Sequence, residues 1–227
     1  MLRITLAAMT LLAAILATAG SFAAGSSGGG VSTADMPREA SMTPEQIANG
    51  HYKSGLRHKK KAWKYEAKAA KYENQKKRDK YLAKAQKSYG KAVVQQGNAL
   101  KAFPDHSEAA NELGYALRKT GEYTKAIGAY NYALKINPDF YQAIEYRGEA
   151  LLAIGRIDNA KQDYMRLFRA DRELARQLMD AMDAWLASQE QQSDSVMEFG
   201  DWVVERKALA EMTQDLSANN ARSWQAQ

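Results

Sequence analysis

The strongest constraint on the fold is an internal repeat with a period of 34 residues. Residues 107–140 are largely restated in residues 141–174. The offset of 34 aligns Gly114 with Gly148, Ala116 with Ala150, Leu117 with Leu151, Gly121 with Gly155, Ala126 with Ala160, and Tyr130 with Tyr164. A fixed period in this range is typical of stacked supersecondary units. The chain is therefore predicted to contain an array of such units.

Each unit is predicted to hold two helices separated by a glycine. Gly121 and Gly155 favour the left-handed conformation that ends a first helix. The predicted first helices are about 107–120 and 141–154, and the predicted second helices are about 123–136 and 157–170. Gly114 and Gly148 lie inside first helices, where glycine costs about 1 kcal/mol relative to alanine. That cost predicts that a partner helix approaches closely at both positions.

The first unit resembles the tetratricopeptide repeat. The matching residues are Ala110, Leu113, Gly114, Leu117, Ala126, Tyr130, Ala133 and Pro138. The second unit is a looser match, with Arg147 where leucine is usual, Leu167 where a small residue is usual, and Arg172 in the place of Pro138. The usual tryptophan of the family is absent from both units. The resemblance implies an all-α fold, a right-handed solenoid of helix hairpins, and a protein that binds other macromolecules rather than an enzyme.

The segments around the two units are also predicted to be helical. Residues 43–106 are rich in Lys, Ala and Tyr and contain a degenerate repeat, which predicts an extended N-terminal hairpin with helices at about 56–73 and 79–103. Thr43, Pro44 and Gln46 form a helix-start signal, but Gly50 and Gly55 interrupt the helix that it would begin. Residues 175–216 are predicted to form C-terminal capping helices, the last at about 194–216. Residues 217–227 are a polar tail.

The N-terminus predicts export. Residues 1–23 combine a basic start, a short apolar core and small residues, as in a secretory signal peptide, and residues 24–42 read as a flexible linker. An uncleaved anchor is the alternative, although sixteen apolar residues are short for a span of about 20. Nothing later reaches transmembrane length. With no cysteine for disulfides, we expect a bacterial periplasmic or extracellular protein stabilised by helix packing.

The net charge of +6 hides a gradient along the chain. Residues 51–101 hold 16 Lys/Arg against 3 Asp/Glu, a local +13. Residues 102–170 hold 9 of each sign, and residues 171–227 hold 5 against 11, a local −6.

The sequence offers little support for chemistry. The three histidines, His51, His58 and His106, lack the spacing of metal ligands. There is no glycine-rich phosphate loop and no nucleophile elbow. We therefore expect no catalytic residue, no cofactor and no metal.

The resemblance implies a concave groove lined by the first helices. Its predicted residues are Glu108, Asn111, Glu112, Tyr115, Arg118 and Lys119 from the first unit and Gln142, Glu145, Tyr146 and Glu149 from the second. This acidic, tyrosine-bearing set suits a basic or polar segment of a partner protein. Family members that clamp a C-terminal carboxylate use Lys and Asn at particular groove positions. This sequence has Asn111, Tyr115, Glu145 and Glu149 at the matching places, so we do not expect that kind of peptide binding. An ordinary charged surface is the alternative.

The basic stretch over residues 57–91 is a second candidate. Its lysines at Lys59, Lys60, Lys61, Lys64, Lys68 and Lys71 suit an anionic membrane surface or another polyanion. A solvated helix face and association with the acidic end of a second copy are the alternatives. Nucleic acid is disfavoured, because an exported chain rarely meets it. The partner's identity and the oligomeric state are not encoded in any motif.

Overall fold

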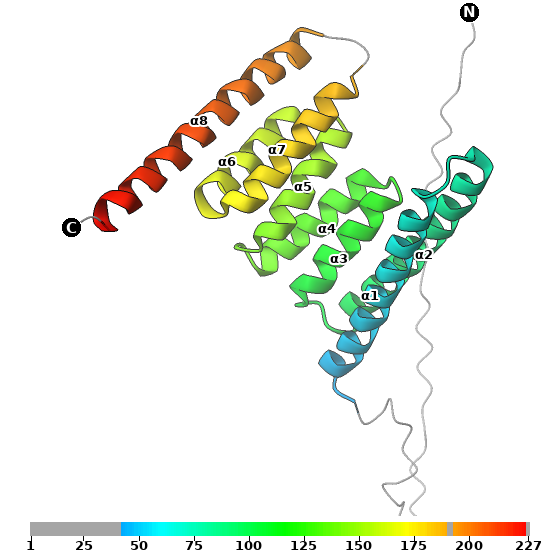
Figure 1. Cartoon of the computed structure of the whole chain (residues 1–227). Helices are drawn as coiled ribbons and strands as arrows, with labels where there is room; N and C mark the ends of the chain where they lie inside the picture. The colour runs from blue at the N-terminus through cyan, green and yellow to red at the C-terminus, as the bar shows by residue number, and fades with distance from the viewer. Residues whose placement is uncertain (1–41, 190–192, 226–227) are drawn as a thin grey trace, which may run out of the picture. The chain divides into compact units, whose positions relative to one another are not determined.

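The computed structural model describes residues 42–189 and 193–225, with side chains as far as residue 213. These residues form eight α-helices and no strand (Figure 1). The helices are α1 (Pro44–Ala69), α2 (Gln75–Ala102), α3 (Ser107–Lys119), α4 (Tyr123–Ile136), α5 (Tyr141–Ala153), α6 (Ile157–Ala170), α7 (Arg172–Ala187) and α8 (Asp194–Gln225). The predicted signal peptide and most of the predicted linker lie outside the described residues, and the domain boundaries stay a prediction.

α1 begins earlier than the sequence predicted. The Thr43 side chain accepts a hydrogen bond from the Gln46 backbone at 3.2 Å, and the Gln46 side chain accepts one from the Thr43 backbone at 2.9 Å. From this capping box the helix runs unbroken through Gly50 and Gly55, so the predicted start at residue 56 is wrong. Gly55 is buried, and a methyl group there would collide with the Gln96 side chain of α2. Close packing against α2 offsets the low helix propensity of glycine.

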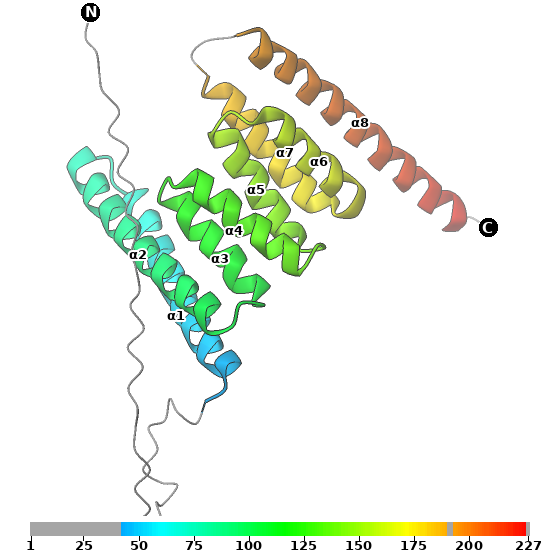
Figure 2. The ribbon, with the colours of Figure 1, turned by 180° about the vertical axis from the view of Figure 1, so that it is seen from behind.

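α1 and α2 form the predicted extended hairpin and lie side by side in both ribbon views (Figures 1 and 2). The turn falls at residues 70–74, slightly before the expected polar segment, because Asn74 caps α2 by accepting a hydrogen bond from the Lys77 backbone at 3.0 Å.

The two repeat units are the hairpins α3–α4 and α5–α6, at the predicted positions. Gly121 and Gly155 adopt φ angles of 83° and 71° after the first helices. Gly114 and Gly148 mark close approaches, as predicted, although to different partners. An added Cβ would lie 2.5 Å from the Tyr130 ring on α4 at Gly114, and 2.7 Å from the Leu178 side chain on α7 at Gly148. The first contact lies within a unit, and the second joins the array to its C-terminal cap.

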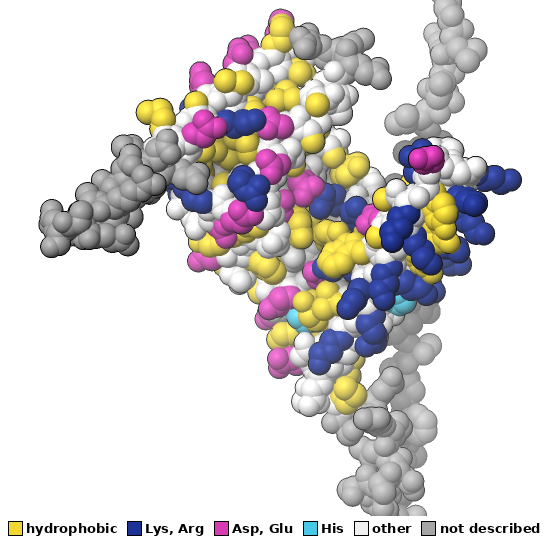
Figure 3. Space-filling view, viewed as in Figure 1, with side chains coloured by type: hydrophobic (Ala, Val, Ile, Leu, Met, Phe, Trp, Pro, Cys, Tyr) yellow, Lys and Arg dark blue, Asp and Glu magenta, His cyan; other side chains and the backbone are white. Residues whose placement is uncertain are grey.

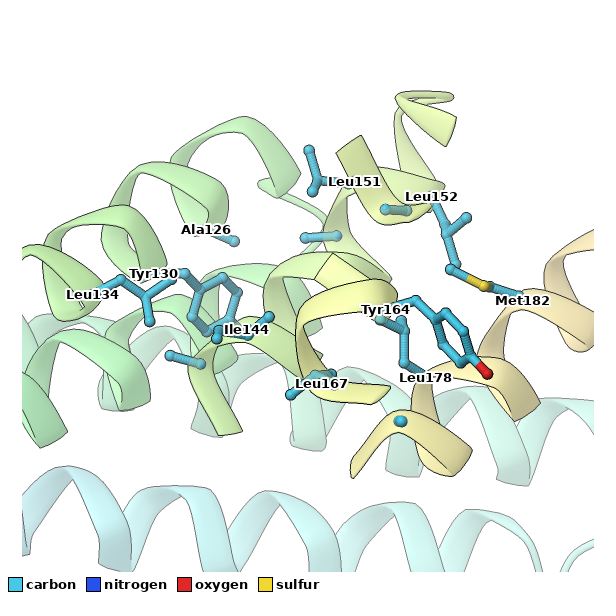
Figure 4. Packing of buried hydrophobic residues seen from close by; sticks show 14 of the residues in the cluster. Ala126, Tyr130, Leu134, Ile144, Leu151, Leu152, Tyr164, Leu167, Leu178 and Met182 are labelled. Atoms are coloured by element: carbon cyan, nitrogen blue, oxygen red, sulfur yellow. The ribbon is translucent and has the colours of Figure 1, made fainter. Parts of the chain in front are cut away.

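One apolar cluster runs from the repeat units into the C-terminal helices (Figure 4). The labelled side chains in that view come from α4 to α7 and include Tyr130, Ile144, Tyr164 and Leu178. Phe199 and Val203 of α8 belong to the same cluster. The core thus passes from hairpin to hairpin, which confirms an all-helical repeat array.

Arg147, the departure from the family pattern in the second unit, is part of a polar contact between helices. Its guanidinium donates to the Asp163 carboxylate of α6, with Nε 2.9 Å from Oδ2 and Nη2 2.5 Å from Oδ1. Nη1 donates to Oδ1 of Asn131 on α4 at 2.7 Å. Asp163 is 3% exposed. An ion pair therefore takes the place of the usual leucine packing.

The C-terminal helices close the array. Asp171 caps α7 by accepting hydrogen bonds from the backbones of Glu173 at 3.1 Å and Leu174 at 3.0 Å. α8 continues to Gln225, beyond the predicted end at 216. Lys207 of α8 pairs with Asp183 of α7 at 2.7 Å. Among the described residues, no helix has both the length and the apolarity that a bilayer crossing requires.

Candidate functional site

The first helices of successive hairpins, α1, α3, α5 and α7, contact one another in order. We call the surface that they share the first-helix row. It carries the predicted groove residues on α3 and α5. It also carries side chains of α1 that sequence reasoning assigned elsewhere.

Three polar contacts join α1 to α3. Lys59 pairs with Glu112 at 2.5 Å. The Trp63 indole Nε1 donates to the Tyr115 hydroxyl at 2.7 Å. Lys119 pairs with Glu66 at 2.8 Å. Lys59, Trp63 and Glu66 were missed as groove residues, although their spacing of four and three places them on one helix face.

Aromatic rings continue along the row from α1 to α5. The Trp63 and Tyr115 centroids are 6.1 Å apart, and those of Tyr115 and Tyr146 are 5.2 Å apart. The Arg118 guanidinium lies 5.5 Å from the Tyr115 ring and 5.2 Å from the Tyr146 ring, and it pairs with Glu149. Trp63 is 43% exposed. The row therefore presents an open aromatic side chain beside a partly buried, charge-compensated network.

The other predicted groove residues behave differently. Glu108 binds His106 and Ser107 near the start of α3. Asn111 is buried, and its Oδ1 has no hydrogen-bond partner among the described residues. Gln142 donates to Glu145 at 2.8 Å. The structure thus brings six of the ten predicted residues into one network, namely Glu112, Tyr115, Arg118, Lys119, Tyr146 and Glu149.

Glu145 is a buried carboxyl group beside a second acid. It is 3% exposed. Burial, followed by the charge of Glu149, raises the pKa of Glu145 to about 8. Its neutral form is therefore favoured in the folded chain at neutral pH. The expectation of an acidic groove needs revision, because Glu112 and Glu149 are paired and Glu145 is largely protonated.

The Glu145→Gln variant should be more stable than the wild type at high pH. Between the unfolded pKa near 4.5 and the folded value of about 8, the folded state holds a proton that the unfolded state has lost. The stability of the wild type therefore falls across this window. We expect the variant to gain about 1–3 kcal/mol on the wild type at pH 9 and little at pH 4.5. Urea unfolding at several pH values measures the difference.

Glu108→Gln is the matched control for Glu145→Gln. A backbone hydrogen bond, then His106, lowers the pKa of Glu108. Its ionised form thus stabilises the fold above the unfolded pKa, and this contribution is lost as pH falls through the folded pKa. Glu108→Gln should lower stability at neutral pH, which is the opposite sign. Equal pH profiles for wild type and Glu145→Gln would contradict the assignment of the buried proton.

The predicted polyanion contacts divide into three groups. Lys59 belongs to the first-helix row. Lys60, Lys61, Lys64 and Lys68 line a surface hollow on α1. Lys71 lies in the turn after α1 and lines neither of the hollows found on this hairpin. Figure 3 shows Lys and Arg side chains gathered over the α1–α2 hairpin.

The described residues contain no group of three or more His, Cys, Asp or Glu side chains placed to hold a metal ion.

Comparison with known proteins identifies one repeat directly. Residues 107–140 match the family model of the tetratricopeptide repeat. Similar solved structures include the first TPR of Spaghetti (RPAP3) bound to HSP90 peptide SRMEEVD, at 23% identity and a TM-score of 0.40, covering 57% of this chain and 96% of that chain. The first TPR domain of the human RPAP3 protein is 21% identical, with a TM-score of 0.39, and covers 57% of this chain and 98% of that one. No curated protein matches. Residues 107–140 are therefore identified as a tetratricopeptide repeat, and they lie within an array of helix hairpins.

Proposed function

We propose that this protein is a non-enzymatic scaffold that holds a segment of a partner protein against the first-helix row. The observation that carries the proposal is the exposed Trp63 ring, fixed by its hydrogen bond to Tyr115 at the edge of the aromatic series. Tryptophan anchors of this kind often dominate binding at protein interfaces. Because the hydrogen bond fixes the ring before binding, little side-chain entropy is lost when a partner covers it.

The revised chemistry of the row also describes the segment that it suits. Glu112 and Glu149 are already paired within the chain, so neither carboxylate is free to bind a strongly basic segment. The exposed indole and the adjoining rings favour a segment with apolar and polar side chains. Affinity would come from covering Trp63, with the surrounding ion pairs excluding water.

Trp63→Ala tests this function, and Leu82→Ala is its control. Leu82 is 42% exposed on α2 and belongs to none of the buried clusters. Peptides selected from a display library on the full chain should bind Trp63→Ala about tenfold more weakly or worse. They should bind Leu82→Ala with unchanged affinity. Selected peptides that bind all three proteins equally would refute a site at Trp63.

The charge-reversal variants suggested by an acidic groove are unsuitable for this purpose. Glu145 is buried and Glu149 compensates Arg118. Reversing either charge would disturb the fold, so a loss of binding would not identify a contact.

We also propose that the protein acts outside the cytoplasm. The support is the signal-like composition of residues 1–23 and the absence of cysteine. Cell fractionation with mass measurement of the purified protein tests this. A cytoplasmic product that retains residues 1–23 would refute it.

A further inference from the structure

A basic hollow lies in the crevice between α1 and α2. His58 and Lys61 of α1 line it together with Lys84, Lys87, Ser88 and Lys91 of α2. Its volume is about 240 Å³. We call it the basic crevice. No carboxylate lines it.

A second hollow adjoins the basic crevice along α1. Its volume is about 470 Å³, and it shares Lys61 and Tyr65 with the first. Its other lining residues are Arg57, Lys60, Lys64 and Lys68. The two hollows therefore place eight Lys and Arg side chains on one continuous part of the hairpin. Every charged side chain that lines them is a cation.

These cations are not paired with carboxylates of the described residues, although Lys61, Lys68 and Lys84 lie over tyrosine rings of the hairpin. In the part of the chain that the structure describes, none of the eight forms an ion pair, whereas neighbouring Lys59 pairs with Glu112 across to α3. The exposed face of α7 shows the more usual arrangement, in which Arg176 pairs with Glu173 and Asp180. Unpaired like charges held together raise the free energy of the folded state. An anion would relieve this repulsion.

The cations of the two hollows affect the pKa values of titratable groups beside them. Burial, then the charges of Lys91, Lys61 and Arg57, lowers the pKa of His58. On the neighbouring Tyr81, a hydrogen bond from Tyr72 and then the charge of Lys68 lower the pKa of the phenol. Both groups thus respond to an excess of positive charge.

We propose that the basic crevice is a binding site for a compact anion carrying two or more phosphate groups. The crevice lies below the range of about 300–1,000 Å³ usual for drug-sized ligands, so it suits a small anion better than a folded partner or a duplex. Lysine ammonium groups bind phosphate as point charges and need no fixed bidentate geometry. The adjoining hollow provides cations for a further phosphate. This site is separate from the one proposed at Trp63.

Tripolyphosphate is the probe, titrated calorimetrically into the full chain at low salt. The test variant is Lys61→Glu with Lys91→Glu. The control is Lys53→Glu with Lys76→Glu, which makes the same charge change on exposed residues of the same hairpin outside both hollows. We expect the test variant to bind at least about tenfold more weakly, and the control less than about threefold more weakly. Binding of the wild type should weaken as salt rises.

The pKa of His58 reports on binding within the basic crevice, which a measurement sensitive only to net charge would not. A bound anion offsets Lys61, Lys91 and Arg57, with Lys84 and Lys87 in the same crevice, so the pKa of His58 should rise when tripolyphosphate is added. NMR titration measures it, with His51 and His106 as internal references. Because protonated His58 adds a positive charge, the ratio of affinity at pH 5.5 to affinity at pH 8 should be higher for the wild type than for His58→Gln, which meets the same change in the charge of the probe.

The outcomes separate the possible sources of phosphate. If the wild type binds vesicles containing phosphorylated lipid headgroups but not tripolyphosphate, and the test variant loses this binding, the site stands and its ligand is a lipid headgroup. Equal losses in the test and control variants would overturn the proposal, because only net charge would matter. An unchanged His58 pKa at saturating tripolyphosphate would also overturn it. So would binding of duplex nucleic acid or a second copy of the chain in preference to both phosphate probes.

Discussion

Tyr130→Ala is expected to cost about 3–5 kcal/mol of stability, the range found for truncating a fully buried aromatic side chain. Tyr130 has no exposed surface, packs over Gly114 and lies in the apolar cluster that links the repeat units. Alanine would leave a cavity between α3 and α4 that the rigid helix pair cannot close. Chemical unfolding monitored by circular dichroism measures the loss.

Tyr130→Phe separates packing from hydrogen bonding. The Tyr130 hydroxyl is buried near the Arg118 guanidinium, but the two groups do not meet hydrogen-bond geometry. Removing it should be neutral or stabilise the protein by up to about 1 kcal/mol, because an unsatisfied buried polar group is costly. A large loss in Tyr130→Phe would show that the hydroxyl makes an essential bond in solution.

Arg147→Leu should destabilise the protein by about 2–4 kcal/mol, although it restores the usual residue of the family. Without the guanidinium, the buried Asp163 carboxylate loses both of its charged hydrogen bonds, and Asn131 loses a donor. Burial already outweighs the ion pair and raises the pKa of Asp163. The variant should therefore regain part of its stability at low pH, where Asp163 is protonated.

The double variant Arg147→Leu with Asp163→Ala is the decisive comparison. Removing both partners removes the buried charge, so the double variant should be more stable than Arg147→Leu alone. Thermal unfolding of the four proteins completes the cycle. Additive losses would show that the two side chains do not interact in solution.

Most of the fold could be predicted from the sequence, because glycine and alanine residues mark its close helix contacts and its helix ends. Gly114 and Gly121 set a close helix contact and a helix end, and both requirements depend on local backbone geometry. Gly55 misled the prediction, because its contact with Gln96 comes from a residue far away in the sequence. A glycine inside a helix can be the residue that allows two helices to pack closely.

The candidate site was harder to predict because its ion pairs join segments that are distant in the sequence. The sequence indicates which residues of α3 and α5 share a face. It does not show that Lys59 and Glu66 lie opposite Glu112 and Lys119. Nor does periodicity reveal that Glu145 is buried. Pairing and burial changed the predicted groove from an acidic surface into a compensated aromatic one.

The order of the helices in the structure gives the charge gradient a direction in space. The segment with a local charge of +13 forms the first hairpin, and the segment with a local charge of −6 contains α7 and α8 at the other end of the series. The chain is therefore an electric dipole along its series of repeats. In the field of an anionic surface or ligand, such a dipole turns its basic hairpin forward before contact and increases the fraction of productive encounters.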